Sequence, residues 1–152
     1  MAKFIYPFQR ILDLKENEKE FAQIQMAEAI RKQETSFRKN QEILRKISEV
    51  ENEKNQKQKD GVNIFELRML EDYIDQLKNQ LQVSEKELEH RDRQLVQTQS
   101  HLRVKAQEEK TWIQLKNHRL KQFDQEMKAS EQAFFDELAA NRFYRALSTD
   151  RG

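Results

Sequence analysis

One interior glycine constrains the fold of this chain more than any other residue. Gly61 lies in the stretch Lys59-Asp60-Gly61-Val62-Asn63, whereas Gly152 is the last residue and the single proline, Pro7, lies near the start. Glycine and proline are the strongest helix breakers, so a long helix can reverse at one interior place only. Gly61 can adopt the left-handed conformation that follows a helix end, and Asn63 is a suitable N-cap for the next helix. The sequence therefore predicts two helices joined by a turn at about 59–63.

The composition favours an elongated all-α protein over a rounded domain. Of the 152 residues, 36% are charged and 36% are hydrophobic, which leaves too few apolar residues for a large core. Disorder is the alternative for so polar a chain. The net charge of only +1 and the helical spacing of the apolar residues argue against it.

Several classes of protein are excluded by what the sequence lacks. It contains no cysteine, which removes disulfides and thiolate metal sites. It has no apolar run near the ~18 residues of a membrane span, and its apolar start is too short for a signal peptide. The 28 basic and 27 acidic residues are interspersed, so we expect no nucleic-acid surface. A soluble cytoplasmic protein is predicted.

The apolar residues recur at helical spacing on both sides of the turn. Before it they lie mostly three, four or seven apart, which predicts an amphipathic first helix over about 7–58. After it a heptad repeat predicts a second helix over about 64–146, with an insertion of the stutter type near Ala106. The second helix carries its heptad repeat at Leu67, Ile74, Leu81, Leu88, Leu95 and Leu102, and then at Ile113, Leu120, Met127 and Phe134.

The two patterns match each other when the chain is folded at Asp60-Gly61. Opposite residues then have numbers that sum to roughly 121, within a few residues. This register pairs Ile47 with Ile74 and Leu44 with Leu77, and it sets bulky Phe37 against small Ser84. Apolar residues meet apolar residues, which favours an antiparallel two-helix coiled-coil hairpin over one unbroken helix that dimerises in parallel.

The second helix is longer than the first and is expected to overhang it. The first helix is used up opposite Ile113, so about thirty helical residues have no partner within the chain. These residues keep more apolar surface than an isolated helix should expose to water, which predicts a contact with another protein. The apolar residues of the overhang are Leu120, Phe123, Met127, Phe134, Phe135, Leu138, Phe143 and Tyr144.

No pattern in the chain indicates catalysis or a cofactor. His90, His101 and His118 are too far apart to form a pair of metal ligands on one helix face. The carboxylates alternate with Lys and Arg at i, i+3 and i+4, as on a solvated helix face with weak ion pairs. No glycine-rich phosphate loop is present. We therefore expect no enzyme, no metal and no cofactor, and we interpret Trp112 as a structural cap beside Ile113.

The opening of the first helix resembles that of FliJ proteins of the bacterial flagellar type III export apparatus. The stretch that carries the resemblance is Phe8-Gln9-Arg10-Ile11-Leu12-Asp13-Leu14-Lys15-Glu16-Asn17-Glu18. Length and layout agree over nearly the whole chain, because FliJ proteins are about this size and form an antiparallel two-helix coiled coil. The family is also similar to the central stalk subunit of rotary ATPases.

This resemblance implies a non-enzymatic stalk and chaperone component with two main partners. Its helical termini would enter the hexameric ring of the export ATPase, and its other end would reach the export-gate membrane protein at the inner membrane. Other export chaperones are further implied partners. The overhang fits this role, since a single helix that projects past a coiled coil can enter the hole of a ring. The residues expected to contact the ring are Phe8, Phe123, Met127, Phe134, Phe135 and Leu138.

The resemblance also implies residues for the gate. FliJ proteins contact the gate through an aromatic residue and a leucine four residues apart early in the second helix. Tyr73 and Leu77 match this pattern, whereas Gln80 and Ser84 stand where the family has a small residue and a histidine. Two alternatives remain open at this point: the equivalent stalk of a virulence-type injection system, and a coiled-coil scaffold unrelated to ATPases.

Overall fold

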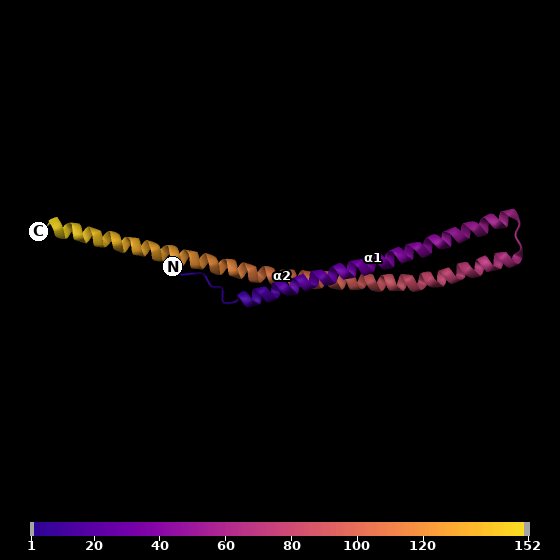
Figure 1. Cartoon of the computed structure of the whole chain (residues 1–152), viewed down its shortest axis with the longest axis horizontal. Coiled ribbons are helices and arrows are strands. Elements are labelled where there is room, and N and C mark those ends of the chain that lie inside the picture. Colours follow the sequence, from indigo (N-terminus) through magenta and orange to yellow (C-terminus); the bar gives the residue numbers. More distant parts are fainter. Residues whose placement is uncertain (1, 151–152) are drawn as a thin grey trace. The chain divides into compact units, whose positions relative to one another are not determined.

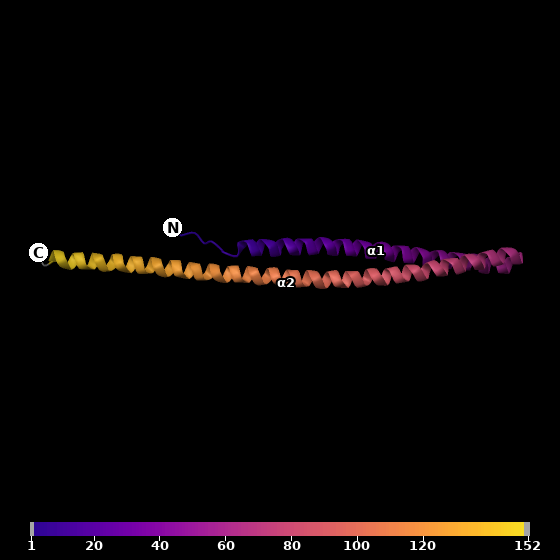
Figure 2. The same cartoon turned by 90° about the horizontal axis from the view of Figure 1, so that it is seen from below.

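The chain folds into two long helices joined by a short turn (Figure 1). The computed structural model describes residues 2–150, in which α1 spans Gln9–Asp60, α2 spans Ile64–Asp150 and no strand occurs. The predicted all-α helical hairpin is confirmed. By contacts the chain divides into two compact units, Glu18–Ala106 and Met1–Asn17 with Gln107–Gly152. Within the first of these, α1 and α2 lie side by side and run in opposite directions (Figures 1 and 2).

The turn has the chemistry that the sequence indicates. Gly61 has a φ of 81°, in the left-handed region that a residue with a Cβ rarely adopts. Asn63 caps α2, because its side-chain oxygen accepts a hydrogen bond of 3.2 Å from the backbone N–H of Phe65. Lys57 and Lys59 lie in the last turn of α1, at the negative end of the helix dipole. The reversal is therefore local to residues 61–63.

The first helix begins two residues later than expected because Pro7 forms a turn of its own. The backbone N–H of Gln9 donates to the carbonyl of Tyr6 at 3.2 Å, which closes a turn with Pro7 at its second position. The carbonyl of Phe8 then accepts the first helical bond, 3.1 Å from the N–H of Leu12. Phe8 thus caps α1 and lies outside the helix.

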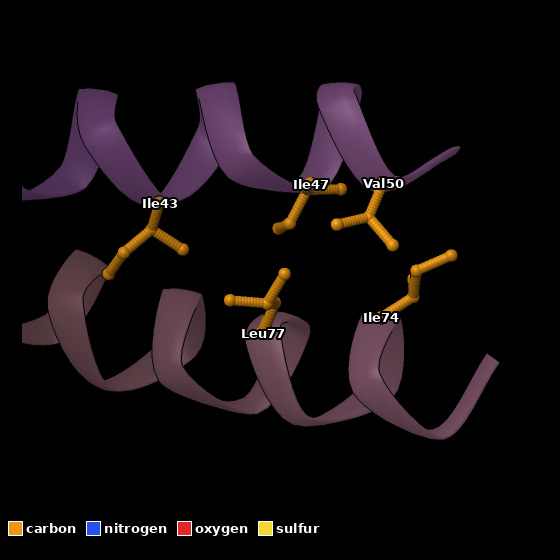
Figure 3. Packing of buried hydrophobic residues seen from close by; sticks show 5 residues of the cluster. All are labelled: Ile43, Ile47, Val50, Ile74 and Leu77. Atoms are coloured by element: carbon orange, nitrogen blue, oxygen red, sulfur yellow. The ribbon is translucent and has the colours of Figure 1, made fainter. Parts of the chain in front are cut away.

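The apolar core lies beside the turn (Figure 3). Ile43, Ile47 and Val50 of α1 pack against Ile74 and Leu77 of α2, and all five side chains are buried. Figure 3 shows Leu77 opposite Ile47 and Ile74 opposite Val50. Burial of each such side chain contributes about 1.5 to 3 kcal/mol to the stability of the fold.

The observed register differs from the predicted one by about three residues. The numbers of opposite residues sum to about 124, as for Ile47 with Leu77, because α1 continues to Asp60 and the turn is centred on Val62. The predicted pairing of Leu44 with Leu77 is wrong, and so is that of Phe37 with Ser84. Leu44 and Phe37 are 40% and 48% exposed, since they lie beside the contact line between the helices and not in it.

Away from this core the contact line of α1 contains mostly small, polar and charged side chains. Its positions on α1 alternate in steps of three and four, as in a coiled coil. They are Leu12, Lys15, Lys19, Ala22, Met26, Ala29, Gln33, Ser36 and Asn40, followed by Ile43, Ile47 and Val50 of the core. Asn40 and Ser84 are buried, and neither Asn40 Oδ1 nor Ser84 Oγ has a hydrogen-bond partner. This polar layer stabilises the hairpin little.

We predict that Asn40→Leu raises the stability of the hairpin. A buried oxygen without a hydrogen-bond partner destabilises the fold by about 1 to 3 kcal/mol, and the substitution removes this oxygen. Small Ser84 leaves room for the larger apolar side chain. Thermal and denaturant unfolding followed by circular dichroism will measure the gain. Gln41→Leu, at the exposed neighbouring position, is the matched control and should change stability by less than about 0.5 kcal/mol. A destabilised Asn40→Leu variant would contradict the assignment of a poorly packed polar layer.

Candidate partner-binding sites

The last part of α2 has no partner within the chain. Every residue from 128 to 150 is exposed, and in both views no other described segment lies beside this end of the helix (Figures 1 and 2). We call residues 128–150 the tail. Its large apolar side chains are Phe134, Phe135, Leu138, Phe143, Tyr144 and Leu147, which are 40% to 76% exposed. An isolated helix of this length is only marginally stable in water, so the tail is suited to fold firmly on a partner.

The apolar side chains of the tail surround the helix. At 100° per residue, Phe134 and Leu138 lie on one face, which continues the face of Met127. Phe143 and Leu147 lie roughly opposite. A helix with exposed large apolar side chains on all sides is suited to a partner that surrounds it. Leu147 is not among the residues predicted for the overhang, because it lies beyond the predicted helix end at about 146, whereas α2 continues to Asp150.

The uncovered part of α2 begins later than the sequence predicts. The segment before α1 extends the contact, because the ring of Phe4 packs on that of Phe123 with 5.5 Å between centroids. Phe123 and Met127 are half-buried as a result. The prediction that the overhang starts after Ile113 is therefore wrong, because the segment 2–8 lies along α2 beyond that residue.

Side chains in this segment alternate between α2 and solvent. Phe4 is half-buried and Tyr6 is 7% exposed, whereas Ile5 between them is 81% exposed. Such alternation is typical of an extended chain that lies on a surface. Phe8 is 40% exposed, and its ring lies 5.9 Å from that of Trp112. The interpretation of Trp112 as a structural cap agrees with this contact.

The two residues expected at the export gate lie in different environments. Tyr73 is 44% exposed, whereas Leu77 is 3% exposed and packs in the core against Ile47. Leu77 is therefore not part of an exposed patch, because the observed register directs it into the contact line between the helices. Of the pair, Tyr73 alone is accessible to another protein.

Tyr73 lies on an edge of the hairpin that also carries a groove. Tyr73, Gln80 and Glu87 are seven residues apart on α2 and so share one side of the coiled coil. Glu87 forms an ion pair of 3.9 Å with Lys39 of α1 across this side. We call it the Tyr73 edge. Its groove of about 450 Å³ is lined by Lys39, Ile43, Gln76, Asn79, Gln80, Val83, Ser84 and Glu87.

Neither a metal centre nor a membrane span is found in residues 2–150. This range contains no group of three or more His, Asp or Glu side chains that could hold a metal ion. Neither helix has a stretch that is apolar enough to cross a membrane.

Comparison with known proteins agrees with this arrangement. A family model described as the flagellar FliJ protein matches residues 4–148. The chain belongs to the FliJ family. A flagellar FliJ protein of Bacillus subtilis (strain 168) is 28% identical over 138 residues, which cover 91% of this chain and 94% of that relative. The family predicted from the opening of the first helix is confirmed.

A solved structure shares the fold of this FliJ-family chain. It is CT670 from Chlamydia trachomatis, described as a homologue of YscO. The two chains superpose with a TM-score of 0.57 over 99% of this chain and 100% of the other, at 18% sequence identity. At that identity the likeness concerns the fold alone, and it supports the helical hairpin.

We predict that Tyr6 anchors the first segment of this FliJ-family chain to α2. Tyr6→Ala removes a buried side chain worth about 1.5 to 3 kcal/mol, so residues 2–8 should detach and expose Trp112 to water. Because Trp112 is the single tryptophan, a shift of its fluorescence to longer wavelength will report the change. Ile5→Ala, at an exposed neighbouring position, should leave the emission unchanged. Equal spectra for both variants would contradict the anchoring role.

Proposed function

We propose that this chain is a stalk of the flagellar type III export apparatus that inserts its tail into the hexameric export ATPase. The observation that carries the proposal is the tail itself, a helix of residues 128–150 that is exposed throughout and has large apolar side chains on all sides. The central hole of a ring surrounds whatever enters it, so it offers apolar contacts to every face of such a helix. Membership of the FliJ family supports the assignment to this apparatus.

The proposed ring contact is centred on the tail and not on the start of the hairpin. Phe134, Phe135 and Leu138 are exposed and lie on consecutive turns, and the rings of Phe134 and Phe135 are 6.0 Å apart. Phe123 and Met127 are half-covered, and Phe8 is packed on Trp112. We therefore propose that Phe8, Phe123 and Met127 support the base of the tail and contact the ring at most at its rim.

The proposed contact with the export-gate membrane protein lies on the Tyr73 edge. Tyr73 offers an exposed aromatic ring, and the groove beside it has Ile43 and Val83 among its lining residues. Aromatic side chains next to a partly apolar groove are common anchors of protein interfaces. In this proposal the chain works on the cytoplasmic side of the inner membrane and acts as a linker, not as an enzyme.

Removal of the tail should abolish stimulation of the export ATPase. Each phenylalanine buried at the ring contributes about 1.5 to 3 kcal/mol, so truncation after Lys128 should lower the affinity at least about a hundredfold. ATP hydrolysis by the purified ATPase, titrated with full-length and truncated chain, measures the effect. Phe134→Ser with Leu138→Ser should reproduce the loss, and Ser130→Ala, at an exposed position of the same helix, should not.

The same titration separates the alternatives. Normal stimulation by the truncated chain would show that the tail is not the ring contact. No stimulation by the full-length chain, together with dimerisation, would support a coiled-coil scaffold unrelated to ATPases. The stalk of a virulence-type injection system remains the second candidate. Restored motility in a strain that lacks its own FliJ gene and receives the gene for this chain would argue against that candidate.

Tyr73→Ala should weaken binding to the gate protein without a loss of stability. Tyr73 is 44% exposed and lies outside the core, so the melting temperature should stay nearly constant, whereas the affinity should fall about tenfold or more. Isothermal titration with the cytoplasmic domain of the gate protein measures the change. Lys78→Ala, on the opposite edge of the hairpin, is the matched control. An unchanged affinity for Tyr73→Ala would remove Tyr73 from the gate contact.

A further inference from the structure

A second apolar surface lies on α1, separate from the tail and from the Tyr73 edge. Ile30, Phe37 and Leu44 are seven residues apart and are 37%, 48% and 40% exposed. We call them the α1 stripe. Each follows a residue of the contact line between the helices, and these residues are Ala29, Ser36 and Ile43. The chain thus buries small Ser36, half-buries small Ala29 and leaves their bulky neighbours at the surface, which intramolecular packing does not explain.

The α1 stripe lies on the edge of the hairpin opposite to Tyr73. Grooves on the Tyr73 edge are lined by Ser36 and Ile43, but by none of the three residues of the stripe. On the opposite edge the amide Nε2 of Gln33 donates to Asp92 at 3.2 Å, and a groove is lined by Asp75 and Lys78. The stripe and these residues of α2 therefore border the same side of the coiled coil.

The border of the stripe is acidic. Residues of α2 that share this edge form two rows. Lys78, Glu85 and Asp92 are seven apart in one row, and Asp75 and Glu89 are fourteen apart in the adjacent row. Glu34 of α1 extends the border on the other side of the stripe. All six side chains are exposed, and Lys78 is the one basic residue among them. A partner that covers the stripe must therefore carry positive charge at its rim.

We propose that the α1 stripe is a docking site for an amphipathic helix of another protein, with Lys or Arg on both sides of its apolar face. The three residues of the stripe span about 21 Å along α1, or four helical turns. Their spacing of seven residues matches the i and i+7 positions through which a docked helix makes its contacts. A second copy bound through the same edge is disfavoured, because it would set acidic rows against acidic rows. The site is independent of the ATPase contact and of the gate contact.

Two synthetic peptides test the proposal with the full-length chain. Both are helices of about 18 residues with the same leucine face, and one carries lysine and the other glutamate at all polar positions. Fluorescence anisotropy of the labelled peptides at low and high salt measures binding. We expect the lysine peptide to bind at least tenfold more tightly, and high salt to weaken it.

Substitutions then assign the binding to the stripe. Phe37→Ser should lower the affinity for the lysine peptide about tenfold, whereas Val83→Ser, exposed on the Tyr73 edge, should change it less than twofold. Glu85→Lys with Glu89→Lys keeps every apolar residue and should reverse the preference between the peptides, so the test holds even if Phe37→Ser is unstable. Equal binding of both peptides, unchanged binding by both variants, or self-association of the chain that Phe37→Ser abolishes would overturn the proposal.

Discussion

The packing of Ile43, Ile47 and Val50 on Ile74 and Leu77 is the interaction on which the register of the hairpin depends. Along the rest of the contact line, small, polar or charged side chains pack with less apolar surface, so they discriminate weakly between registers. The core lies beside the turn, and the turn itself is fixed by the left-handed conformation of Gly61. The two constraints together set which side chains of each helix face inward and which face a partner.

Charged pairs replace apolar layers farther from the turn. Lys105 forms a salt bridge of 3.1 Å with Glu18, and Lys15 forms one of the same length with Glu108. These side chains are 23% to 35% exposed, so the pairs contribute modestly to stability and weaken at high salt. Their main effect is on specificity, because an antiparallel arrangement in another register would separate the opposite charges.

The sequence predicts the two helices and the turn correctly, because these follow from strong local signals such as the single interior glycine and the capping residue Asn63. It predicts the family correctly from the opening stretch of the first helix. It does not predict which of two adjacent apolar rows on α1 enters the contact line. Phe37 is more hydrophobic than its neighbour Ser36, and Leu44 is about as hydrophobic as its neighbour Ile43. Hydrophobicity alone therefore selects the wrong row. The sum of opposite residue numbers is about 124 instead of 121, and this difference decides the outcome; Leu77 lies between the helices in either register.

The first segment was missed for a different reason. Residues 2–8 are too few for a helix or a heptad pattern, and their contact with Phe123 depends on a turn at Pro7 that propensity alone does not require. The tail is the opposite case. Its apolar residues are visible in the sequence, and the structure adds that they lie on all sides of one helix.

Hydrogen exchange of backbone amides tests most directly whether the tail is kept free for a partner. In the isolated chain, amides of residues 128–150 should exchange much faster than those of residues 67–102, because a lone helix opens readily whereas the paired part of α2 does not. Addition of the hexameric export ATPase should slow exchange throughout the tail, on all of its faces. A tail that is already protected in the isolated chain, or that exchanges equally fast with and without the ATPase, would contradict the proposed function.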